Sequence, residues 1–84
     1  MSRALIITAD DFGLTSGINE GILRGHLDGM ITATSVLAVG QACDEGLALL
    51  RETPTLDVGV HLALVGEDPP LTAPGLIPTL VDDN

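Results

Sequence analysis

The chain has 84 residues, of which 45% are hydrophobic and 18% charged, so it is long enough for one small globular domain and no more. Its formal net charge of −9 argues against binding to nucleic acids or anionic membranes and suits a neutral ligand, such as a sugar, or a cation. Cys43 is the single cysteine, which rules out an internal disulfide. The apolar run at residues 4–7 is too short for a signal peptide or a membrane span, so we expect a cytoplasmic protein.

The first part of the chain predicts a strand followed by a helix. Residues 4–8 are continuously apolar and rich in β-formers, which is typical of a strand covered on both faces. Residues 9–14 predict a loop. The helix is expected to begin near Thr15 or Ser16, either of which can cap it, and to stop at residues 28–29. Its apolar stripe recurs with helical spacing and comprises Ile18, Ile22, Leu23, His26 and Leu27.

A second strand, a second helix and a third strand follow in order. Residues 32–39 predict the strand, residues 41–52 the helix and residues 56–64 the third strand. Pro54 disfavours helix in the residue before it and so ends the second helix. The side chains expected to be buried on that helix are Leu47, Leu50 and Cys43. The pattern is βαβαβ, which predicts an α/β fold with a parallel sheet and right-handed crossovers.

The remaining residues, 66–84, contain four of the five prolines and show no regular period. An irregular stretch of this length is uncommon in a compact domain and is usually functional. We treat residues 1–84 as a single partial domain, because three strands and two helices leave a sheet edge and one face bare. The expectation is an open architecture that is cut short.

Asp10 and Asp11 come directly after the first predicted strand. In parallel α/β folds, ligands bind at the rim formed by the carboxyl ends of the strands. Two adjacent carboxylates repel each other unless a cation or a proton lies between them. One can therefore bind a metal while the other acts as a base. The alternative is a solvated acidic turn that caps the following helix.

His61 lies on the third predicted strand, whose two faces differ. Val58, Val60, Leu62 and Leu64 point to one side, and Gly59, His61 and Ala63 point to the other. We expect the bulky face to pack on helices. The imidazole lies between two very small residues, which leaves the space that a metal or sugar site needs. A hydrogen-bonded core histidine is the alternative. The first and third strands can bring Asp11 and His61 to one rim.

Other polar residues predict structural roles. We expect His26 to pack near the end of its helix without a chemical role, and Cys43 to be a small buried residue. Asn19 and Glu20 are interpreted as serving the first turn of the first helix. The hydroxyl side chains of the second strand can line a pocket, although β-propensity explains the threonines equally well; they are Thr32, Thr34 and Ser35.

Five segments carry a resemblance that spans nearly the whole chain in order, with Ala9-Asp10-Asp11-Phe12-Gly13 and Asp57-Val58-Gly59-Val60-His61-Leu62 as the most specific pieces. The segments are residues 6–14, 18–22, 29–35, 56–64 and 70–82. Together they resemble the YdjC-like carbohydrate deacetylases. The resemblance implies a (β/α) barrel and a hydrolase that removes acetyl groups from N-acetylated sugars such as chitooligosaccharides.

The same resemblance implies roles for three residues. Asp10 matches the family's catalytic base, and Asp11 and His61 match two ligands of its one divalent metal ion. Mixed nitrogen and oxygen ligands admit magnesium, zinc, manganese or cobalt. The family's third ligand, another histidine, lies beyond the segment that this chain matches. We therefore expect an incomplete fragment that is inactive alone; its partner would be an N-acetylated sugar, and self-association is also open to it.

Three other classes of protein share parts of this pattern. A phospho-receiver module would need an aspartate at the end of the third strand, where this chain has His61 to Leu64. A dinucleotide-binding fold would need a glycine-rich turn after the first strand, where this chain has two acids. A non-catalytic barrel remnant that pairs through its open edge remains an alternative.

Overall fold

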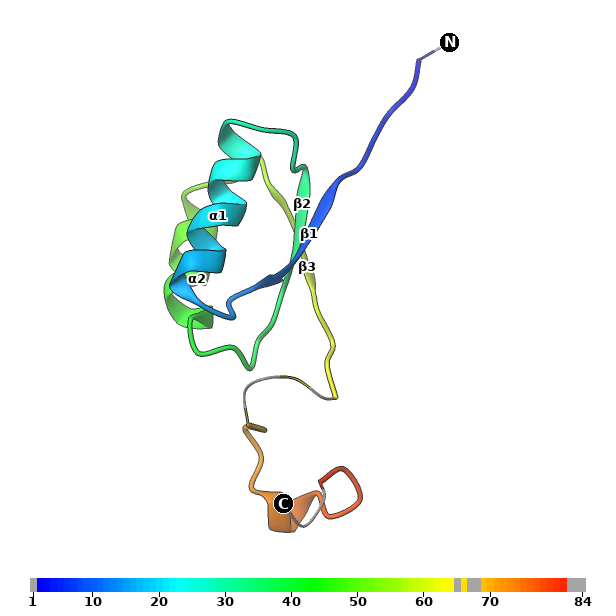
Figure 1. The fold of residues 1–84 in the computed structure, drawn as a ribbon, viewed down its shortest axis with the longest axis vertical. Coiled ribbons are helices and arrows are strands. Elements are labelled where there is room, and N and C mark those ends of the chain that lie inside the picture. Colours follow the sequence, from blue (N-terminus) through cyan, green and yellow to red (C-terminus); the bar gives the residue numbers. More distant parts are fainter. Residues whose placement is uncertain (1, 65, 67–68, 82–84) are drawn as a thin grey trace.

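The computed structural model describes residues 2–64, 66 and 69–81. Three strands form one parallel sheet in the order β1-β2-β3, and both helices lie on the same side of it (Figure 1). The elements in chain order are β1 (Thr8–Phe12), α1 (Ser16–Leu27), β2 (Ala33–Val36), α2 (Cys43–Arg51), β3 (Asp57–Val60) and the 3-10 turn η1 (Pro74–Leu76). The predicted α/β class and βαβαβ order are confirmed.

The first strand lies four residues further along the chain than predicted. The run at residues 4–8 suggested a buried strand, but β2 begins at Ala33, which pairs with Thr8. Residues before Ile7 therefore have no neighbouring strand among the described residues, and Leu5 and Ile6 are about three-quarters exposed. The loop predicted at residues 9–14 is wrong for the same reason, because the acidic pair lies within β1 rather than after it.

β2 and β3 lie where they were predicted but are shorter. The ladder between them runs from Ala33 beside Asp57 to Val36 beside Val60. One further bond continues it, because the backbone N–H of His61 donates to the carbonyl of Val36 at 2.9 Å. The shorter strands follow from β2, which leaves the sheet after Val36 to enter the loop before α2.

The positions predicted for the two helices are largely confirmed. Thr15 caps α1, and its Oγ1 accepts a hydrogen bond from the backbone N–H of Ile18 at 3.0 Å. On α2, Cys43 and Leu50 are buried as predicted, but Leu47 is 41% exposed, so its predicted burial is wrong. The helix instead turns Gly46 toward β1, where a Cβ atom would lie 2.7 Å from the Phe12 ring.

The core lies between the helices and the first two strands. Phe12, the one aromatic residue of the chain, is fully buried at its centre. The buried members of the cluster are Phe12, Ile22, Val36, Cys43, Leu50 and Leu56. Because β3 contributes none of them and all four of its residues are exposed, the helices cover β1 and β2 and leave β3 as an exposed edge.

The prediction that the bulky face of the third strand packs on helices is therefore wrong. Val58 and Val60 pair with Thr34 and Val36, whose side chains are buried, so they face the helix side of the sheet. They nevertheless remain 50% and 73% exposed, because neither helix reaches the edge strand. Leu62 and Leu64, beyond the strand, are more than 80% exposed.

Of the irregular segment predicted at residues 66–84, the described residues lie beyond the sheet (Figure 1). In its described part, 66 and 69–81, the regular structure consists of η1 alone. Residues 67–68 and 82–84 of this prediction lie outside the described residues. None of the helices in the described part of the chain has the length and apolar character needed to cross a membrane.

Candidate metal and base site

A bulge in β1 places both acids on the open side of the sheet. Between two paired positions, β1 advances three residues, from Ala9 to Phe12, while β2 advances two, from Thr34 to Val36. Ala9 and Phe12 both pack toward the helices, so Asp10 and Asp11 between them are both kept off that face. Asp11 adopts a left-handed backbone with φ of 71°. Bulges commonly re-aim side chains next to functional sites, and this one does so for two adjacent carboxylates.

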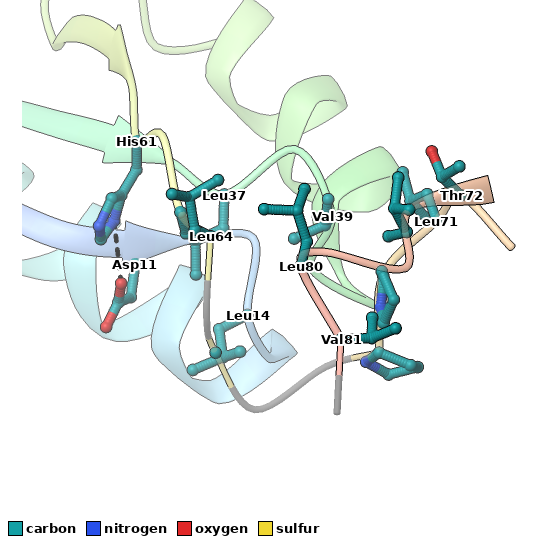
Figure 2. Close-up of a pocket in the computed structure, with 15 residues that line it drawn as sticks. Asp11, Leu14, Leu37, Val39, His61, Leu64, Leu71, Thr72, Leu80 and Val81 are labelled. Atoms are coloured by element: carbon teal, nitrogen blue, oxygen red, sulfur yellow. Dashed lines mark ion pairs between the residues drawn. The ribbon is translucent and has the colours of Figure 1, made fainter. Parts of the chain in front are cut away.

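Asp11 and His61 meet at the carboxyl ends of β1 and β3. Oδ1 of Asp11 lies 3.0 Å from Nδ1 of His61, and Figure 2 shows the imidazole and the carboxylate facing each other. The side chain of Asp11 is 46% exposed and that of His61 is 34% exposed. They are therefore held by the sheet yet accessible to a ligand. The sequence predicted that these two residues share a rim, and the structure brings them together.

The pair has the geometry of two ligands of one cation. Nδ1 of His61 is itself buried and makes no hydrogen bond within the described part of the chain, despite its short distance to Asp11. Two neighbouring ligand atoms that each lie 2.0 to 2.2 Å from an ion are separated by about 2.8 to 3.6 Å, for octahedral to tetrahedral angles at the ion. The observed separation falls in that range, and the buried nitrogen makes no hydrogen bond to Asp11 in spite of the short distance. Both observations fit a divalent ion.

Asp10 is held separately from this pair. The hydroxyl of Ser35, on β2, donates to Oδ1 of Asp10 at 2.9 Å. Hydrogen bonds from the described residues engage only this oxygen of the carboxylate. The two adjacent acids thus have different partners, so they can serve different functions.

The remaining hydroxyls of β2 fasten it to β1. Thr34 is buried, and its Oγ1 donates to the carbonyl of Ala9 at 2.6 Å. Thr32 accepts from the backbone N–H of Ile7 at 2.9 Å. Neither threonine is among the residues that line the groove beside Asp11 and His61. Their role is to hold the strand that carries the acidic pair.

The two histidines of the chain have contrasting surroundings. His26, near the end of α1, has both ring nitrogens within 2.7 Å of oxygen atoms, one on the Ile31 carbonyl and one on the Thr55 hydroxyl. It joins the helix to the segments before β2 and β3, in keeping with the structural role expected of it. Nδ1 of His61, by contrast, is buried beside the carboxylate of Asp11 without a hydrogen bond in the described part of the chain, which suits a ligand role.

Asn19 is the residue whose role the sequence interpretation missed. We expected it to serve the first turn of the helix, whereas the structure buries it completely. Its side chain accepts from the backbone N–H of Gly13 and donates to the carbonyl of Ala42. Helical periodicity carried the signal, because Asn19 lies three residues before Ile22 and four before Leu23, on the apolar stripe.

A groove of about 700 Å³ extends from the pair toward residues 69–81. Asp11 and His61 lie at one end of it, and aliphatic side chains form most of its walls (Figure 2). These include Leu14, Leu37, Val39, Leu64, Ile77 and Leu80. Within the described ranges, no group of three or more histidine, cysteine or acidic side chains is placed to hold a metal, and Asp11 and His61 are the two such side chains that meet at this rim.

Comparison with known proteins defines the class. The model of the YdjC-like protein family matches residues 4–84, nearly the whole chain, and the chain belongs to that family. This confirms the resemblance that the Asp-Asp and His motifs indicated. It also supports the rejection of the phospho-receiver and dinucleotide-binding interpretations.

The individual relatives are named for reactions of carbohydrates. The chain is 45% identical to proteins named chitooligosaccharide deacetylase from Salmonella paratyphi B and Salmonella newport, over 92% of its own length and 32% of theirs. A solved structure from Enterococcus faecalis, described as that of a cellobiose-phosphate cleavage protein, superposes with a TM-score of 0.85 and 38% identity. The match covers 93% of this chain and 31% of that one. The chain thus spans about a third of the length of its relatives.

Proposed function

We propose that this chain supplies the metal-binding and proton-accepting part of a carbohydrate deacetylase, a hydrolase that removes acetyl groups from N-acetylated sugars. The contact between Asp11 and His61 carries the proposal, because two ligand-type atoms lie 3.0 Å apart without a hydrogen bond, one residue from a second carboxylate. Relatives named chitooligosaccharide deacetylase support the substrate class. The complete activity would belong to a longer chain, for which we propose the (β/α) barrel that the resemblance implies.

Asp11 and His61 would hold one divalent ion, magnesium or zinc. An imidazole nitrogen and a carboxylate oxygen suit either metal, and their separation does not distinguish the two. When bound, such an ion supplies the Lewis acidity that polarises an amide carbonyl and makes water easier to deprotonate. The partial exposure of both side chains leaves room for further ligands from outside this segment.

Asp10 would act as the base. Ser35 engages one carboxylate oxygen, which fixes the group and leaves the other oxygen for a proton. In amide hydrolysis, the water oxygen bonds to the acetyl carbon and its proton moves to the base. The bond from carbon to nitrogen then breaks as the nitrogen takes up a proton, which releases acetate and an amino sugar. A neutral sugar meets no charge repulsion from a chain with a net charge of −9.

A non-catalytic remnant is the alternative. It is favoured by the presence of only two candidate ligands in the part of the chain that the structure describes. In a remnant, Asp11 and His61 would have no function in metal binding. Their replacement would then leave the interaction of the chain with divalent ions unchanged.

Calorimetric titration with Zn²⁺ separates the two possibilities. We expect wild-type chain to bind about one equivalent, and Asp11→Ala and His61→Ala each to weaken that binding by about tenfold or more, because each removes a ligand. Asp44→Ala is the matched control, since it removes one exposed acid from the surface of α2. Equal binding by all four proteins would overturn the metal site and favour the remnant.

A further inference from the structure

We propose that Asn19 is a positioning residue for the Asp11–His61 pair, because its side chain locks together the two loops that follow β1 and β2. The inference rests on the proposed metal site and adds a residue outside the ligand set. Asn19 is fully buried on α1, and its oxygen and nitrogen are both engaged with backbone groups.

The amide of Asn19 closes a ring of hydrogen bonds between these loops. Its Oδ1 accepts from Gly13 N–H at 2.6 Å, and its Nδ2 donates to the carbonyl of Ala42 at 3.0 Å. The N–H of Ala42 in turn donates to the carbonyl of Gly13 at 2.9 Å. Asparagine carries both a donor and an acceptor on one short side chain, which this ring requires. A buried replacement that lacks either would leave a backbone group unpaired.

The first loop connects this ring to Asp11. Gly13 lies two residues after Asp11, and both have left-handed backbones, with φ of 99° and 71°. Such conformations are held in place by their surroundings, and the bond from Gly13 N–H to Asn19 is one of the contacts that does so. Gly13 is also packed tightly, since a Cβ atom there would lie 2.9 Å from the carbonyl oxygen of Leu37. The direction in which the bulge presents Asp11 therefore depends on how Gly13 is fixed.

The second loop follows β2, and backbone hydrogen bonds at the end of β2 link it to His61. The N–H of Leu37 donates to the carbonyl of Phe12 at 2.7 Å, which joins the end of β2 to the end of β1. The carbonyl of Val36 accepts from the N–H of His61 at 2.9 Å, which joins β3 to the same point. Asp11 and His61 are thus both attached to backbone segments that are hydrogen-bonded to the two loops joined by Asn19.

His26 provides a matched control on the same helix. Its ring also joins two segments by hydrogen bonds, to the Ile31 carbonyl and the Thr55 hydroxyl, but at the opposite end of α1. Losing it should destabilise the fold without disturbing the loops beside Asp11. A comparison of Asn19→Ala with His26→Ala therefore distinguishes a positioning role from a contribution to stability alone.

The test is a Co²⁺ titration of the 84-residue chain, followed by NMR through the paramagnetic broadening of the His61 ring signals, with urea unfolding of each variant measured in parallel. His61→Ala assigns these signals, because the chain has two histidines. We expect Asn19→Ala to weaken Co²⁺ binding about tenfold or more, as loss of a supporting residue behind a metal site typically does. Asn19→Ser, whose neutral hydroxyl can serve one of the two backbone groups, should lose less, about threefold. His26→Ala should bind Co²⁺ within about twofold of wild type while unfolding at lower urea.

Two results would overturn the positioning role: wild-type affinity in Asn19→Ala, or an equal loss of affinity in His26→Ala. If Asn19→Ala does not fold, Asn19→Ser carries the test, and wild-type affinity in that variant overturns the proposal. A wild-type chain whose His61 signals do not respond to Co²⁺ would refute the metal site itself, and the positioning role with it. That failure is seen before any Asn19 variant is compared.

Discussion

Two adjacent carboxylates with different partners are the most informative feature at the scale of single residues. In a regular strand, Asp10 and Asp11 would point to opposite faces, and one would be forced under the helices. The bulge and the left-handed backbone of Asp11 avoid this. Ser35 then holds Asp10 while His61 faces Asp11. A local backbone irregularity therefore gives two neighbouring acids separate partners on the same side of the sheet.

Ser35 should affect turnover without affecting the metal. In a chimera that carries this chain in place of the matching segment of the Salmonella paratyphi B relative, Ser35→Ala removes the hydrogen bond to Asp10. Hydrogen bonds to charged groups contribute about 1.5–3 kcal/mol. We expect kcat to fall at least about tenfold, with KM and Zn²⁺ affinity unchanged, and Ser35→Thr to restore much of it. Steady-state kinetics provide the measurement, and an unchanged kcat in Ser35→Ala would refute this role.

Sequence reasoning selected Asp10, Asp11 and His61 as candidate site residues but did not select Asn19. The acids and the histidine could be found because their chemistry and their places near strand ends are visible in the sequence. The role of Asn19 depends on two backbone groups, at Gly13 and Ala42, whose proximity is created only by folding. Its place on the apolar stripe indicated burial, but nothing in the sequence indicated these partners.

At the scale of elements, the pairing of β1 with β2, and not local β-propensity, determines where the first strand lies. Residues 4–8 have strong β character, yet the strand is Thr8–Phe12, because β2 begins only at Ala33. The order, the cap at Thr15 and both helices followed from periodicity and from breakers such as Pro54. The exposure of Val60 could not be predicted, because alternation shows which face a residue occupies and not whether a helix reaches it.

The core should be unusually dependent on one side chain. Phe12 is the one aromatic residue of the chain and is fully buried beneath both helices. Replacement by alanine should cost about 3–5 kcal/mol, which is comparable to the whole stability of a domain this small. Urea unfolding monitored by circular dichroism measures the loss. Leu62→Ala, at an 89% exposed position, is the control and should change stability by no more than about 0.5 kcal/mol. Similar effects of the two substitutions would contradict the assignment of the core.

At the scale of the whole molecule, the chain is a strongly acidic three-stranded sheet covered by helices on one face, with the candidate site on the carboxyl rim of its strands. It spans about a third of the length of its deacetylase-named relatives. We expect further strands to continue from the exposed edge at β3 and to supply the remaining ligands. The parallel order and the rim location could be predicted from the sequence. The groove walls contributed by residues 69–81 could not, because that segment has no regular period.

Acetate release by the same chimera tests the central claim most directly. With N-acetylated chitooligosaccharides as substrate, we expect the parent chimera to release acetate. Asp10→Asn keeps the size of the side chain but cannot accept a proton, so it should lower turnover by about 100-fold or more while Zn²⁺ affinity remains within about twofold of the parent chimera. Turnover by Asp10→Asn at the rate of the parent chimera would show that Asp10 is not the base, and would contradict the account of the site given above.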